Sequence, residues 1–157
     1  MEENGCLKDI LPHYIDYEMS KHICRNRCVD DIALIKILEN YPEIGPTSLR
    51  NMGRGNSSKY VCIDSRTGKK RSIIFTFLGR NAEYIVLPRT GYCGCFTRYK
   101  MNINRRRICY HMLTFIIDYF LDAVITYEFK YDNPEILIYN FLLENLPEKG
   151  SSNKKID

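Results

Sequence analysis

Apolar positions in the N-terminal part of the chain recur at spacings of three and four residues. This period is typical of amphipathic helices, and it predicts one helix over residues 7–23. A second helix is predicted after Asp30, a residue type that favours the N-cap, and Pro42 ends its pattern. Residues 41–59 are rich in Gly, Pro, Ser and Asn, and predict a connection with a short helical turn at Ser48 to Met52.

The hydrophobic pattern changes to short β-type runs after this connection. Three runs rich in β-branched and aromatic residues follow one another: YVCID from Tyr60, SIIFTFL from Ser72 and EYIVL from Glu83. Turn-forming residues separate them, with Gly68 in the first connection and the sequence GRNA in the second. The pattern predicts a three-stranded antiparallel meander.

A long apolar segment, Met112 to Ile125, predicts a helix in the second half of the chain. Its polar residues are four apart and form one narrow stripe: Thr114, Asp118 and Asp122. A single small sheet cannot cover so much apolar surface, so we expect either the N-terminal helices or a partner protein to pack over this helix. The two carboxylates make a membrane span too costly, so we expect no membrane association.

These elements predict an α+β fold in which a small antiparallel three-stranded sheet is flanked by N- and C-terminal helices. Residues 1–58 supply the N-terminal helical region and the linker. Residues 59–146 hold the sheet and the later helices, the last of which Asn133 caps with Pro134 at its first position. Residues 147–157 are polar and predict a flexible tail.

Residues 92–113, YCGCFTRYKMNINRRRICYHML, concentrate three of the seven cysteines and one of the three histidines. The pattern is C-x-C-x13-C-x-H, formed by Cys93, Cys95, Cys109 and His111. Thiolate and imidazole are the ligands of structural zinc sites, including sets of three Cys and one His. Because the N-terminus lacks the organisation of a secretory signal, we expect reduced thiols, for which clustering favours metal binding over disulfides. The sequence predicts one Zn²⁺ bound by these four residues.

Local structure can bring the two ligand pairs together. Residues two apart on extended chain point to the same side, so Cys93 and Cys95 can face one ion from a strand end or tight turn, where Gly94 permits a close backbone approach. On a helix, residues two apart lie about 200° apart around the axis. Cys109 is therefore expected just before the helix, and His111 in its first turn.

The same residue types have other interpretations. Cysteine is often a small buried hydrophobe, and any one of the four could simply pack in the core. A second metal site from His22, Cys24 and Cys28 would lack a fourth ligand nearby, so helix-associated thiols are favoured there. Four protein ligands would close the zinc site against substrate, so we expect no enzyme and no small-molecule substrate.

Charge adds two candidate contact regions. The chain has 23 Lys or Arg against 19 Asp or Glu, a net charge of +4 that permits an anionic partner without requiring one. Two basic clusters are candidates for contact with DNA phosphates or an acidic partner. They are Lys69, Lys70 and Arg71 in the first hairpin turn, and Arg105, Arg106 and Arg107 beside the third cysteine of the motif.

The motif and its setting resemble the SWIM zinc-binding domain, in which a β-hairpin precedes the first ligand pair and an apolar helix follows the second. The segments SRTGKKRSIIFTFLGRNAEYIVLPRTGYCGCF and ICYHMLTFIIDYFL are similar to the small SWIM-containing subunits of Shu complexes, over residues 60–125. Phe96 departs from this pattern, since many SWIM domains carry proline after the second cysteine.

This resemblance implies a nuclear, non-enzymatic subunit that forms a heterodimer with a RecA-like recombinase paralogue. Such a subunit promotes recombinase filament assembly on single-stranded DNA during homologous recombination and repair, in meiosis or mitosis. The helix after the histidine would then face the partner through Met112, Phe115, Ile116 and Phe120. Two alternatives are a stand-alone zinc-dependent nucleic-acid-binding module and an adaptor in a ubiquitin-ligase or transposase-like assembly.

Overall fold

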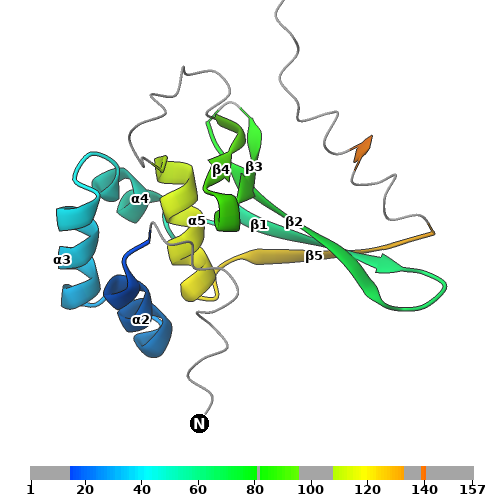
Figure 1. The fold of residues 1–157 in the computed structure, drawn as a ribbon, viewed down its shortest axis with the longest axis horizontal. Coiled ribbons are helices and arrows are strands. Elements are labelled where there is room, and N and C mark those ends of the chain that lie inside the picture. The colour runs from blue at the N-terminus through cyan, green and yellow to red at the C-terminus, as the bar shows by residue number, and fades with distance from the viewer. Residues whose placement is uncertain (1–14, 81, 96–107, 133–138, 141–157) are drawn as a thin grey trace, which may run out of the picture.

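A computed structural model describes residues 15–80, 82–95, 108–132 and 139–140. The described helices are α2 (Tyr17–Asn26), α3 (Asp31–Asn40), α4 (Gly45–Asn51), α5 (Tyr110–Phe120) and the short 3-10 helix η1 (Pro88–Thr90). The strands are β1 (Ser57–Asp64), β2 (Lys70–Leu78), β3 (Glu83–Leu87), β4 (Tyr92–Cys93) and β5 (Ile125–Tyr131). The α+β class predicted from the sequence is confirmed, with α5 between the N-terminal helices and the sheet (Figure 1).

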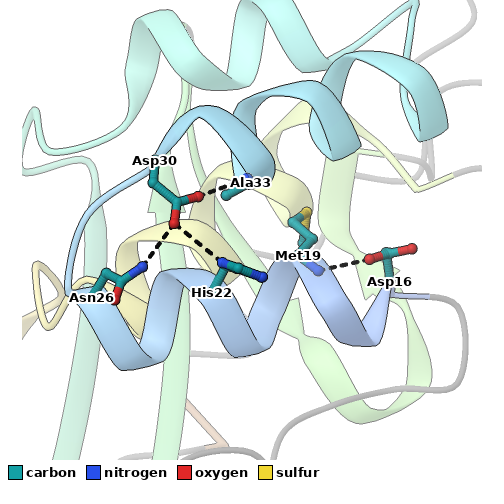
Figure 2. Close-up of polar contacts among 6 residues, drawn as sticks. All are labelled: Asp16, Met19, His22, Asn26, Asp30 and Ala33. Atoms are coloured by element: carbon teal, nitrogen blue, oxygen red, sulfur yellow. Dashed lines mark hydrogen bonds and ion pairs between the residues drawn. The ribbon is translucent and has the colours of Figure 1, made fainter.

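Aspartate side chains begin the first two helices. Asp16 accepts a hydrogen bond from the backbone N–H of Met19 at 2.7 Å, and Asp30 accepts one from Ala33 at 2.8 Å (Figure 2). Each satisfies a backbone donor that has no partner inside its helix. The predicted start after Asp30 is confirmed. The first helix begins at Tyr17 within the described residues and extends to Asn26, beyond its predicted end.

The two caps also join the first two helices to each other. His22 and Asn26 on α2 both contact the carboxylate of Asp30, at 3.1 and 2.7 Å (Figure 2). The amide of Asn40 at the end of α3 reaches back to Asp16 at 3.1 Å. These contacts hold α2 and α3 side by side as a pair.

The sheet has five strands in the order β4-β3-β2-β1-β5. The predicted antiparallel meander of β1, β2 and β3 is confirmed. The prediction that the sheet is three-stranded and wholly antiparallel is wrong, because β4 adds to one edge and β5 pairs with β1 in parallel at the other. The sheet is mixed because the chain between β1 and β5 includes α5, which allows β5 to return in the same direction as β1.

Helix α5 ends earlier than the apolar pattern predicted. Asp122 adopts the left-handed conformation, with φ of 60°, and donates its backbone N–H to the carbonyl of Tyr119. The N–H of Ala123 bonds to the carbonyl of Asp118 at 2.8 Å, which completes a Schellman motif and terminates the helix. Asp122 therefore lies outside the helix, and Ile125 begins β5 instead of ending α5.

Helix α5 is the centre of the hydrophobic core. The residues of α5 with an exposed fraction of 0% include Met112, Phe115, Ile116 and Phe120. The prediction that these residues face a partner protein is wrong, because the same chain covers them. The cover on one side comes from the N-terminal helices, whose buried residues Met19, Ile23 and Ile37 belong to the same core. On the other side, the ring of Phe75 in β2 packs on Phe115 with centroids 5.3 Å apart.

The polar residues of α5 are satisfied inside this core. Thr114 donates its hydroxyl to the carbonyl of Tyr110 at 2.7 Å. The buried carboxylate of Asp118 accepts hydrogen bonds from the N–H of Gly53 at 2.7 Å and from the hydroxyl of Ser57 at 2.6 Å. Burial raises the pKa of Asp118, and these two donors oppose that shift. Asp118 thus ties the turn before β1 to α5.

Several predicted features lie outside the described residues. These are the helix start at Asn133 and Pro134, the tail from residue 147, and the basic cluster at residues 105–107. Within the described chain, no helix combines the length and the apolar character that a membrane crossing requires.

Candidate metal centre

Three structural elements position the four predicted ligands. Cys93 ends β4, where it pairs with Val86 of β3, and Cys95 lies in the turn that follows. Cys109 is the N-cap of α5, in extended conformation with φ of −85° and ψ of 167°, and His111 lies in the first turn of the helix. The predicted positions of Cys109 and His111 are confirmed, and the strand edge meets the helix start at this point.

The four side chains converge on one small volume. The sulfur atoms of Cys93, Cys95 and Cys109 and a ring nitrogen of His111 all lie within 4.8 Å of one another. In a tetrahedral site with metal–sulfur bonds of about 2.3 Å, ligand atoms lie roughly 3.8 Å apart. The cluster is therefore close enough to hold a metal ion, and three thiols with one imidazole are compatible with zinc.

Backbone geometry favours an ionised sulfur at Cys109. Its Sγ accepts a hydrogen bond from the backbone N–H of Met112 at 3.4 Å, at the positive end of the helix dipole. Hydrogen bonds from the thiols of Cys93 and Cys95 lower the pKa of Cys109, and the same bonds raise the pKa of Cys93 and of Cys95. A divalent cation placed among the three sulfur atoms would favour the thiolate form of each cysteine.

The imidazole of His111 is oriented by its neighbours. Its Nδ1 lies 4.0 Å from the sulfur of Cys93, so this nitrogen faces the cysteines. The ring packs against Phe77 of β2 and Tyr84 of β3, with centroids 5.1 and 4.9 Å away. Nε2 lies on the side of Gly79: a Cβ built on that glycine would be 3.2 Å from it. These neighbours hold His111 with Nδ1 available to a metal.

Gly79 provides a test of this packing. A Cβ at residue 79 would lie 2.5 Å from Cε2 of Tyr84, so Gly79→Ala must displace that ring and the imidazole beside it. We expect Zn²⁺ affinity to fall by about 10–100-fold, the usual effect of disturbing groups that orient a ligand. Competition with a chromogenic chelator measures the affinity.

Gly94→Ala is the matched control for that variant. Gly94 lies between two of the ligands, yet a Cβ there would meet nothing nearer than the backbone nitrogen of Ile85 at 3.6 Å, an ordinary contact. The sequence predicted that Gly94 permits a close backbone approach, but the structure leaves room for a Cβ atom at this position. Equal losses of affinity in the two variants, or no loss in Gly79→Ala, would contradict the orienting role of Gly79.

Among the described residues, the lysines of the first basic cluster and His22 are not brought into this centre. Lys69 and Lys70 lie at the tip of the β1–β2 hairpin, which extends away from the helices (Figure 1). Lys70 forms an ion pair with Glu128 of β5 at 3.2 Å. His22 contacts Asp30, and the cluster of Cys93, Cys95, Cys109 and His111 is the one group of this kind in the described parts of the chain.

Sequence reasoning did not find the aromatic residues around His111. Phe77 and Tyr84 are neighbours through the pairing of β2 with β3, and their rings reach the imidazole only because α5 crosses this part of the sheet. The one available signal was the aromatic content of the two predicted strands.

Comparisons with known proteins give no assignment. No family model matches the chain, and neither a curated protein nor a solved structure matches it.

Proposed function

We propose that the protein is a non-enzymatic binding subunit organised by one structural Zn²⁺. The observation that carries this proposal is the convergence of Cys93, Cys95, Cys109 and His111 within 4.8 Å at the junction of β4 and α5. Zinc favours such a set of soft and borderline ligands, and four protein ligands leave no coordination position for a substrate. The ion would join the edge of the sheet to the central helix.

In this proposal the ligands have separate tasks. Cys93 and Cys95 bring the strand edge to the ion, and Cys109 adds a thiolate that the helix start already stabilises. His111 adds a neutral nitrogen and is held by the aromatic rings around it. Because metal binding by such sites is coupled to folding, the bound ion would stabilise the whole core through α5.

The cellular role we propose is that of a nuclear, Shu-type subunit that binds a RecA-like recombinase paralogue and promotes recombinase filament assembly in homologous recombination. The resemblance of residues 60–125 to SWIM-containing subunits supports it. Exposed apolar side chains also support binding to another protein. Because α5 is buried, we place the candidate partner-binding surface on α3 instead. There the exposed fractions of Ile32, Ile35 and Leu38 are 48%, 52% and 40%.

Affinity capture tests this role. The tagged, metal-loaded chain should recover a protein with a RecA-like ATPase fold from an extract of the cells in which the protein naturally occurs. Ile35→Asp should reduce that recovery, because a carboxylate would enter an apolar contact, while zinc content stays unchanged. Capture without any RecA-like ATPase would contradict the recombination role. Salt-sensitive binding of single-stranded DNA by the isolated chain would instead favour the nucleic-acid-binding module.

A further inference from the structure

Strand β5 is a long edge of the sheet. It pairs with β1 over seven residues, from Ile125 to Tyr131, and within the described residues β1 is its one neighbouring strand. Its ladder contains no register shift, and its sequence, ITYEFKY, contains no proline or glycine. Edge strands of monomeric proteins are usually shortened, bulged or interrupted, because a regular edge presents unpaired N–H and C=O groups to another strand. The outer edge of β5 therefore has the chemistry to accept one.

One face of this strand is apolar and exposed. Ile125, Tyr127 and Phe129 alternate along it and are exposed by 40%, 42% and 42%. The ring of Tyr60 on β1 stacks between two of them, with centroids 5.2 Å from Tyr127 and 5.9 Å from Phe129. This exposed apolar face suits contact with further apolar side chains.

The opposite face of β5 carries two charges of opposite sign. Glu128 and Lys130 are two residues apart and so point to the same side. If a second β5 strand approached in the antiparallel direction with Phe129 opposite its own copy, Glu128 of each strand would face Lys130 of the other. If one strand slid by two residues, so that the centre of the pairing moved from Phe129 to a neighbouring residue, Glu128 would lie opposite Glu128, or Lys130 opposite Lys130. The charges thus select one register.

We propose that two copies of the chain join through antiparallel pairing of their β5 strands, centred on Phe129. Charges on an edge strand ordinarily prevent such pairing, but the order of Glu128 and Lys130 makes this edge complementary to itself. The pairing creates one sheet of ten strands, and it brings the two aromatic stacks together on one face.

The proposed dimer and the metal centre lie at opposite edges of the sheet. The strand order β4-β3-β2-β1-β5 places Cys93 at one edge and the dimer contact at the other. Self-association is therefore independent of the proposed function, because neither the metal ligands nor the exposed residues of α3 belong to β5.

Reversing the charges of Glu128 and Lys130 tests the proposed dimer. Sedimentation velocity of the full, zinc-loaded chain should give twice the chain mass of 18.5 kDa. Lys130→Glu places Glu128 opposite a second glutamate at two symmetric positions, and should weaken the dimer about tenfold or more. Glu128→Lys should do the same. The double variant Glu128→Lys with Lys130→Glu reverses both charges, keeps each opposite pair, and should restore the wild-type dissociation constant.

Two controls make the result specific. Glu128 also pairs with Lys70 in its own chain, so Lys70→Ala removes that ion pair without altering the charges that face the second copy, and should leave the dimer intact. Circular dichroism establishes that each variant is folded, since these side chains are on the surface. A monomeric wild-type chain overturns the proposal. A dimer that resists both single exchanges, or that the double exchange fails to restore, overturns it as well.

Discussion

Replacing Cys109 with serine should remove the bound metal and keep the start of α5. The hydroxyl of serine can accept the N–H of Met112 as the sulfur does, so the helix retains its cap. It is a poor zinc ligand, so we expect zinc content to fall from about one ion per chain to near zero. The free energy of unfolding should fall by at least about 3 kcal/mol, because structural zinc contributes on the order of 10 kcal/mol to folding.

Cys109→Ala separates the two tasks of this residue. It removes the ligand and the cap together, so it should be less stable than Cys109→Ser by about 1 kcal/mol, the typical value of an N-cap. Elemental analysis gives the zinc content, and urea unfolding with and without a chelator gives the stabilities. A folded serine variant that keeps its zinc, or a wild-type chain that a chelator does not destabilise, would rule out a structural metal at this site.

Phe115→Ala should destabilise the protein by about 3–5 kcal/mol, with no partner present. The side chain is fully buried between the N-terminal helices and Phe75, so its removal loses apolar contacts and leaves a cavity that the packed surroundings fill only in part. Denaturant unfolding of the purified, zinc-loaded chain measures the loss. A residue that faced a partner would behave differently, because its truncation would affect binding and leave the stability of the isolated chain almost unchanged.

Ile35→Ala is the comparison for this variant. Ile35 is also a large apolar residue on a helix, but 52% of its surface is exposed. Its truncation should cost less than about 1 kcal/mol, as is usual for surface positions. If the two truncations had similar effects on unfolding, the assignment of α5 to the core and of α3 to the surface would be contradicted.

The sequence was informative wherever local rules decide the structure. Asp30 begins a helix because its carboxylate caps it, and the runs beginning at Tyr60, Ser72 and Glu83 form a meander because short turns connect them. The candidate metal centre was predicted by the same kind of rule. A strand end can supply two ligands from residues two apart, and so can the start of a helix. Cys93 lies at the end of β4 and His111 in the first turn of α5, as this rule predicts.

The features that were missed depend on tertiary packing. The segment at Ile125 continues the apolar pattern of α5, but the left-handed residue Asp122 stops the helix and the next segment joins the sheet. Alternation of polar and apolar residues in ITYEFKY was a strand signal, but no local rule predicts that it pairs in parallel with β1. Likewise, the apolar circumference of α5 requires cover, but its sequence does not say whether the chain or a partner supplies it.

The parallel pairing of β5 with β1 has a consequence for chain entropy. Closing a loop costs conformational entropy that increases with loop length. Strand β5 pairs with β1 across a long separation in sequence, as in the pair Ser58 and Ile125, whereas short turns close the meander. A metal bound by Cys93 and His111, which are 18 residues apart, would tie the end of the meander to α5. Helix α5 ends at Phe120, shortly before β5 begins at Ile125. A metal bound there would shorten the free segment of chain between the meander and β5, and would so reduce the conformational entropy that is lost when β5 joins the sheet.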